Sequence, residues 1–178
     1  MLLAAPLAAQ QIKFPPALEK LAAKASETAN VDLDASTLAA AGKLMSGEKA
    51  GEFAAQKLIG GLKGVHVRSF KFEKEGEYSA ADVSSIREQL KGPQWACIVS
   101  VQKKGGETTD VCLHREGDST TGLAVLAAEP KELTVVNIVG TISLEALGSL
   151  TKQLGIAEQL KKGLVETKKV VPQQKKDE

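Results

Sequence analysis

Aromatic residues are scarce in this chain of 178 residues, where Phe, Tyr and Trp together make up only 3%. Such a composition argues against a platform on which nucleic-acid bases would stack. An excess of charge of one sign is also missing, because 23 basic and 22 acidic residues leave a formal net charge of +1. We therefore expect no nucleic-acid partner and no electrostatic attraction to an anionic membrane.

Long hydrophobic runs and catalytic motifs are absent as well. No stretch approaches the about 20 apolar residues that a membrane-spanning helix needs, so we expect no transmembrane segment. The sequence contains no phosphate-binding loop, no Cys-x-x-Cys pair, no nucleophile elbow and no His-rich cluster. No motif predicts a catalytic residue, a cofactor or a metal, and we interpret the chain as a non-enzyme.

The remaining composition is that of a globular protein, with 43% hydrophobic and 25% charged residues. We expect one domain over residues 15–165, which is long enough to bury a sizeable core. The core must consist of Leu, Ile, Val and Ala because aromatic residues are so few. The Lys-rich residues 166–178 are interpreted as a flexible basic tail.

The start of the chain carries the one signal for a cellular compartment. The apolar, small-residue run Leu2–Gln10 resembles the end of a secretory signal peptide, although a charged region before it is missing. We interpret residues 1–14 as the remnant of a signal peptide and a leader, with cleavage after Ala9 or Gln10. This interpretation predicts an exported protein, either periplasmic or secreted.

Helical patterns dominate the first third of the domain. Apolar residues recur at helical spacing over Leu18–Ala25, and Asp34 is placed to cap a second helix. A third helix is predicted from about Glu48 to Gly60, where glycine ends it. Between the first two helices, residues 30–34 alternate and are interpreted as a short extended piece.

A strand is predicted over Val65–Phe72, followed by a helix over Ser79–Leu90. Ser79 and Asp82 have the spacing of a capping box, in which each side chain bonds the other residue's backbone N–H. The apolar stripe of this helix is expected to be buried on the sheet, and it consists of Val83, Ile86 and Leu90.

Beyond this helix the apolar period changes from helical to two, which indicates strands. Turn-forming residues separate four of them, so successive strands are expected to pair as antiparallel hairpins. The predicted strands are Trp95–Lys103, Thr108–Arg115, Thr121–Ala128 and Leu133–Gly140.

These elements predict a two-layer α+β fold with a mostly antiparallel five-stranded sheet and a helical N-terminal third. The Ser79–Leu90 helix and a C-terminal helix from Ser143 are expected on one face of the sheet. The last two strands are apolar on both faces. We therefore expect both faces to be covered there, by the N-terminal helices or by another copy of the chain.

Several segments together resemble a family of exported bacterial proteins known as domain of unknown function 4252. They are the strand start Leu62–Val65, the helix before Trp95, the hairpin Ala96–Arg115, the run Gly122–Val125 and the strand Glu132–Ile142. The resemblance covers roughly residues 15–155 and implies a location in the bacterial envelope. It also implies a genetic association with alternative sigma factors and their antagonists. It implies no activity and no site residue.

The strongest candidate for chemistry is a row on the second predicted hairpin strand. Asp110, Cys112, His114 and Glu116 alternate with Val111, Leu113 and Arg115 and therefore share one face of the strand. Thiolate, imidazole and carboxylate are plausible zinc or copper ligands, and a Cys112–His114 pair is a possible nucleophile and base. A linear row does not converge on a point, however. We therefore interpret it as a solvated sheet face and predict neither a metal site nor a catalytic site.

The register of the first hairpin bears on the two cysteines. If Val99 faces the core together with Val111, then Cys97 lies opposite Leu113 and on the face away from Cys112. A one-residue slip would bring the cysteines together but would turn the apolar residues away from each other. We therefore predict two free thiols.

The function that these observations favour is a non-catalytic envelope protein that acts as an interaction or regulatory module. Its expected partner is another envelope protein or a second copy of the chain. The alternatives are a carrier that binds a lipid or another hydrophobic ligand in a deep apolar cavity, and a hydrolase, redox or metal-binding protein based on Cys112 and His114.

Overall fold

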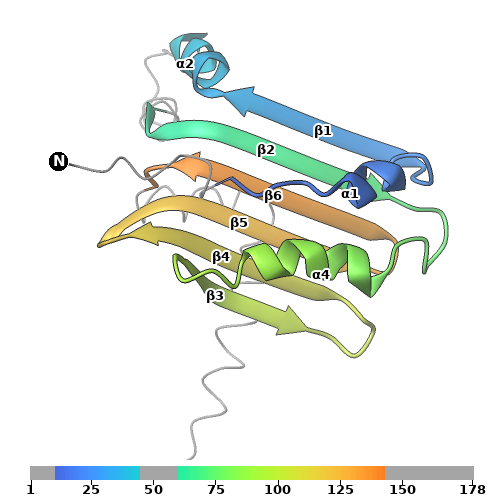
Figure 1. Ribbon diagram of the computed structural model, residues 1–178. Helices are drawn as coiled ribbons and strands as arrows, with labels where there is room; N and C mark the ends of the chain where they lie inside the picture. The colour runs from blue at the N-terminus through green and yellow to red at the C-terminus, as the bar shows by residue number, and fades with distance from the viewer. Residues whose placement is uncertain (1–10, 45–59, 143–178) are drawn as a thin grey trace, which may run out of the picture.

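The computed structural model describes residues 11–44 and 60–142, in which six antiparallel strands form one sheet in the order β1-β2-β6-β5-β4-β3 (Figure 1). Three described helices accompany the sheet. In chain order the elements are α1 (Pro16–Leu21), β1 (Glu27–Asp34), α2 (Ala35–Leu44), β2 (Leu62–Lys71), α4 (Ala80–Gln89), β3 (Trp95–Gln102), β4 (Thr108–Glu116), β5 (Ser119–Glu129) and β6 (Glu132–Gly140).

The predicted fold class is wrong in two respects: the sheet has six strands instead of five, and the N-terminal third is not helical. The additional strand is β1, which pairs with β2 through eight consecutive residues from Glu27 to Asp34. Its Thr, Asn, Val and Asp residues are weak helix formers, so pairing with β2 decides its conformation. The helices predicted from Glu48 and Ser143, and the basic tail, lie outside the described residues.

The prediction of four successive strands after Trp95 is confirmed, with bounds that differ by one or two residues. Two of the predicted turns depend on glycine, because Gly106 and Gly117 have φ angles of 86° and 60°. This left-handed region is costly for residues that carry a Cβ atom. Local turn chemistry therefore accounts for the part of the fold that the sequence predicts best.

Helix α4 lies in the connection from β2, next to the β1 edge, to β3 at the other edge, and it lies over one face of the sheet (Figure 1). The predicted capping box is present, since Ser79 and Asp82 bond each other's backbone N–H. Val83, Ile86 and Leu90 are buried, and Ile86 is 0% exposed, as the apolar stripe predicts.

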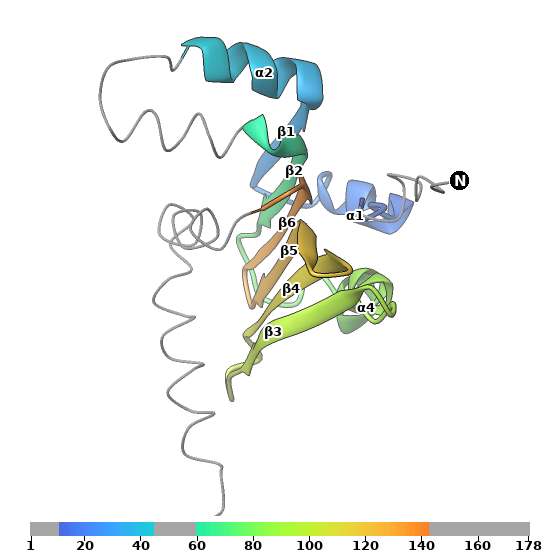
Figure 2. The same ribbon diagram turned by 90° about the vertical axis from the view of Figure 1, so that its left-hand side faces the viewer.

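Helix α1 covers the same face as α4 (Figure 2). The described chain already contributes to this layer before α1, because Ile12 is buried and its backbone N–H donates to Asn137 Oδ1 at 3.0 Å. We call this side the helix face. Its buried residues include Phe70, Cys112 and Leu126.

The opposite side of the sheet, which we call the second face, carries a separate buried cluster that includes Val111, Leu123 and Ile138. Helix α2 contributes Leu38 to this cluster beside β1 and β2. Neighbouring residues of β5 that point to opposite faces, Val125 and Leu126, are both buried. This finding confirms the prediction that the last two strands are covered on both sides.

Candidate functional site

The register of the six strands places one residue from each strand in a row across the helix face. We call it the cross-sheet row, because each member lies directly opposite the next on the neighbouring strand. Its members are, in order, Asp32, His66, Asn137, Ala124, Cys112 and Cys97. The row joins two polar regions at opposite edges of the sheet, one predicted from sequence and one not.

The predicted region surrounds the Cys112 end of the row. Asp110, Cys112 and His114 are 7%, 0% and 0% exposed, so the interpretation of this strand face as solvated is wrong. Alternation correctly placed these side chains on one face. It could not show which face is wet, because helix α4 and Trp95 cover the polar side and the second cluster lies on the apolar side.

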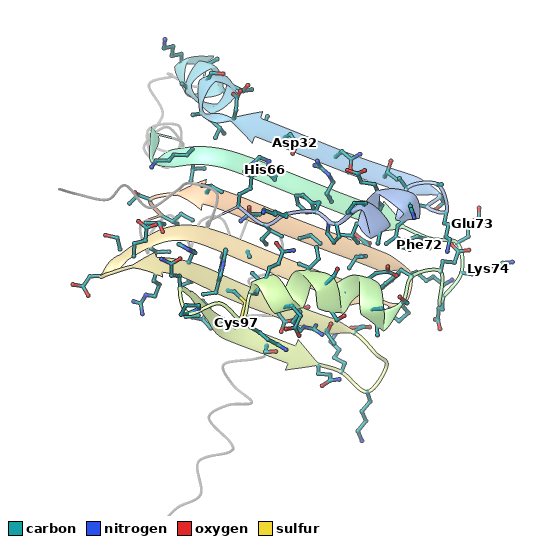
Figure 3. All side chains as sticks on the ribbon, viewed as in Figure 1. Asp32, His66, Phe72, Glu73, Lys74 and Cys97 are labelled. Atoms are coloured by element: carbon teal, nitrogen blue, oxygen red, sulfur yellow. A yellow bond between two sulfur atoms is a disulfide. The ribbon has the colours of Figure 1, made fainter. Side chains whose placement is uncertain are left out.

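Cys97 and Cys112 form a disulfide, so the prediction of two free thiols is also wrong (Figure 3). The predicted pairing of Val99 with Val111 is correct. The register shifts between Cys97 and Val99, where a bulge inserts Ile98, and Cys97 therefore lies opposite Cys112. The bulge keeps Val99 and Val111 paired on the second face and also brings Cys97 and Cys112 together on the helix face.

The disulfide leaves no free thiol in the cross-sheet row. The chain has only two cysteines, and both are used in the bond. Since the reactive form of cysteine is the thiolate, Cys112 in this state is neither a nucleophile for His114 to activate nor a metal ligand. Among the described residues, no group of three or more His, Cys, Asp or Glu side chains is arranged to hold a metal ion.

Asp110 is held by polar groups from two other elements, α4 and β3. Arg87 of α4 donates from Nε to Asp110 Oδ2 at 2.9 Å, and Ser100 of β3 donates its hydroxyl to Oδ1 at 2.5 Å. The same guanidinium also donates to Thr108 Oγ1 at 3.1 Å. Because its oxygens are occupied by these donors, the carboxylate ties α4 to the sheet and is not placed to act on a substrate.

His114 lies beyond the disulfide on β4. Its Nδ1 lies 2.9 Å from Thr121 Oγ1, and its ring meets Trp95 edge to face with the centroids 5.1 Å apart. Its Nε2 is buried without a hydrogen-bonding partner among the described residues. Burial lowers the pKa of His114, against a smaller opposing effect of the half-buried Glu116, so the imidazole is neutral at neutral pH.

The polar region at the other edge was missed from the sequence. His66 Nδ1 lies 2.9 Å from Asp32 Oδ1 (Figure 3). Arg68 donates to Asp32 Oδ2 at 2.7 Å. The hydrogen bond from Arg68, and then that of His66, holds the pKa of Asp32 below its usual value. Arg68 also stacks over the ring of Phe14, 4.8 Å from its centroid. The only signal in the sequence was His66 two residues before Arg68, and nothing there linked them to Asp32.

A shallow pocket of about 450 Å³ lies between α4, Trp95 and the segment before α1. Four of its seven lining residues are polar: Gln11, Lys13, Ser85 and Gln89. A second pocket of about 410 Å³ lies near the turn at Gly105 and Gly106 and also has a mixed lining. Neither is the deep apolar cavity that a carrier of a hydrophobic ligand would need.

Comparison with known proteins returns one family. The family model described as a domain of unknown function, number 4252, matches residues 22–150. No curated protein and no solved structure matches the chain significantly. Within the described residues, every helix is too short or too polar to cross a membrane.

Proposed function

Because the chain belongs to the family of domain of unknown function 4252, no activity comes with its membership, and we propose a function from the site itself. The protein is a non-catalytic, exported component of the bacterial envelope that acts as an interaction or regulatory module. The observation that carries this proposal is the disulfide between Cys97 and Cys112, which uses the only two thiols of the chain.

The disulfide supports export because such bonds persist in oxidising compartments and are rare where thiols are kept reduced. The expected cleavage after Ala9 or Gln10 is compatible with the packing of the N-terminal segment. A mature chain that begins at Gln10 or Gln11 retains Ile12, which is buried and bonded to Asn137.

The engagement of the polar groups supports a role other than catalysis. Asp110 is bonded to Arg87 and Ser100, and Asp32 is bonded to Arg68 and His66. A general base must lie within hydrogen-bonding reach of the proton that it takes from a substrate. Here the carboxylates contact the protein's own cations, which is the arrangement of structural ion pairs.

The intact mass of protein isolated from its native host tests the export proposal. We expect a chain that begins at Gln10 or Gln11 and lacks the two hydrogens of free thiols. Reduction of the same sample should restore these hydrogens and serves as the internal control. A full-length, reduced chain in the cytoplasmic fraction would overturn the proposal.

Chemical cross-linking in intact cells tests the interaction proposal. A reproducible complex that contains the chain, as a dimer or with another envelope protein, is the expected result. A chain that stays monomeric in cells, together with a turnover activity of the purified protein that is lost in His114→Gln, would assign it to the enzymes instead.

A further inference from the structure

The two edges of the sheet differ in how well they exclude an additional strand. At the β3 edge, the bulge at Ile98 interrupts the regular register, and bulges are a common protection against edge-to-edge pairing. The β1 edge has no such interruption, since all eight of its residues pair in sequence with β2. Neither edge strand contains proline, lysine or arginine, the residues that most often block an edge, so the bulge is the feature that distinguishes β3 from β1.

Strand β1 buries little of its own surface. Seven of its eight residues are exposed, and Leu33 alone is half-buried. Val31 is 36% exposed and, with Ile98 at 49%, is one of the two large hydrophobic residues that are exposed in the described part of the chain. Figure 1 shows α2 at the end of β1, while the middle of its outer edge runs beside no other described element.

The side chains of β1 are sorted between the two faces of the sheet. Leu33 packs with the second-face cluster, so Ala29 and Val31, at spacings of two, point to that side as well. Asp32 bonds His66 and Arg68 on the helix face, so Thr28 and Asn30 share that side. An added strand must therefore be apolar on one side and polar on the other.

We propose that this added strand is the β1 of a second copy of the chain, paired antiparallel about a two-fold axis at Val31. Val31 then faces its own counterpart, and Ala29 faces Leu33, so the apolar row of the second face continues from one copy into the other. On the helix face, Asn30 lies opposite Asp32. The two six-stranded sheets become one continuous sheet.

Several positions of the two-fold axis would keep the second faces of both copies on the same side. The charges on β1 favour the axis at Val31 among them. With the axis at Asp32, two aspartates would lie directly opposite each other, which is unfavourable. With the axis at Asn30, Glu27 would lie opposite the apolar Leu33. With the axis at Val31, no carboxylate within Thr28–Asp34 faces another carboxylate.

The carboxylates of β1 are also compensated within their own chain, which permits two copies to approach. Lys71 Nζ lies 3.2 Å from Glu27 Oε2, and Asp32 has its pair of partners on β2. Asp34 accepts hydrogen bonds from Ser36 and Thr37. Because α2 begins at Ala35, we place the core of the contact at residues 29–33.

This inference deepens the proposed function, since it names the partner of the interaction module as a second copy of the chain. Its failure is separable from failure of the export proposal. The intact-mass measurement does not depend on dimerisation, and cross-linking in cells distinguishes a dimer from a complex with another protein.

Cysteine cross-linking of the purified mature chain tests the pairing. Because both native cysteines form the disulfide, Val31→Cys introduces the only free thiol. Directly opposite residues in antiparallel strands have Cα atoms about 4.5–5.5 Å apart, which a disulfide can span. A mild oxidant such as diamide should convert Val31→Cys to a covalent dimer and leave Ile98→Cys, the matched change at the opposite edge, monomeric.

Asn30→Cys tests the register and should not cross-link to itself. Self-cross-linking of Asn30→Cys without that of Val31→Cys would overturn the proposed axis. Cross-linking of Ile98→Cys alone would move the contact to β3 and would also overturn the proposal.

Sedimentation of non-covalent variants gives an independent measurement. Val31→Lys places two ammonium groups at the axis and should weaken self-association by about tenfold or more, whereas Ile98→Lys should leave it unchanged. Both positions are exposed, so both variants are expected to fold. A wild-type chain that stays monomeric at high concentration, or a dimer that neither lysine affects, would overturn the proposal.

Discussion

The two edges of the sheet are held by different kinds of interaction. On the β3–β4 side a disulfide joins the strands, and the buried Asp110 binds Arg87 of the covering helix. On the β1–β2 side the strands share a regular ladder of pairs and exposed ion pairs, such as Asp32 with Arg68. The β3–β4 side is held by a covalent bond and a polar network around the buried Asp110, while the β1–β2 side is held by strand pairing and exposed ion pairs.

The two sides therefore differ in how much they contribute to the stability of the fold and in how accessible they are to a binding partner. Exposed ion pairs contribute about 0–1 kcal/mol, whereas a disulfide contributes about 2–4 kcal/mol and buried hydrogen bonds are costly to leave unmade. The β3–β4 side therefore anchors the fold. The β1 side contributes less to the core and keeps a surface that can bind another strand.

The largest contrast between the two sides is expected from apolar truncation. Ile86→Ala should lower the free energy of unfolding by about 2–5 kcal/mol, because Ile86 is fully buried between α4 and the sheet. Val31→Ala on β1 should lower it by less than about 1 kcal/mol. Denaturant unfolding at concentrations where the chain is monomeric measures both, and similar losses for the two variants would contradict the comparison.

Removal of the disulfide should have the next largest effect. The double variant Cys97→Ala and Cys112→Ala should be less stable by about 2–4 kcal/mol, because its unfolded chain is no longer constrained by the cross-link. Reductant should destabilise the wild type by a similar amount and leave the double variant unchanged. A double variant as stable as the oxidised wild type would show that the disulfide does not anchor this edge.

Two aspartates, one buried and one exposed, offer a matched test of their ion pairs. Asp110→Ala removes the buried acceptor of Arg87 and Ser100 at a partly buried site and should lower stability by about 1–3 kcal/mol. Asp32→Ala removes an exposed pair and should lower it by less than about 1 kcal/mol. Thermal or denaturant unfolding compares them, and a larger effect at Asp32 would reverse the assignment of the anchored side.

The smallest expected effect is a pH dependence that arises on the β3–β4 side. Burial lowers the pKa of His114 in the folded state, so the unfolded chain takes up this proton first as the pH falls. Stability should therefore decrease as the pH falls from about 6.5, the ordinary histidine value, toward the lower folded pKa.

The difference between wild type and His114→Gln isolates this effect in unfolding measurements between pH 7.5 and pH 5, about the range of histidine titration. The lowered pKa values of Asp32 and Asp34, the latter about 2, affect stability only in a more acidic range. An identical pH dependence in the two proteins would exclude His114 as its source.

Much of the helix face was predictable because its signals are local. The turns at Gly106 and Gly117, the capping box at Ser79 and the stripe through Ile86 all follow from residues within a few positions of each other. The sequence also placed Asp110, Cys112 and His114 on one face correctly. Whether that face was wet depended on which face α4 covers, and the residue spacing within the strand does not decide this.

The two errors with the most influence on function have one physical origin. The bulge at Ile98 and the pairing of β1 with β2 are both choices of register between strands, and register depends on what each face can bury. The same choices produced the Asp32–His66 contact, whose members are 34 positions apart in the chain. No spacing rule connects residues at that separation.

The sequence by itself determined the strands after Trp95, their turns, the α4 cap and the family to which the chain belongs, since each depends on short-range conformational preference or on a recognisable pattern. Only the tertiary structure decided that Cys97 meets Cys112, that the polar row is buried and that β1 remains an exposed edge. These outcomes depend on which residues are opposed across strands and on what covers each face, and contacts between separate elements decide both.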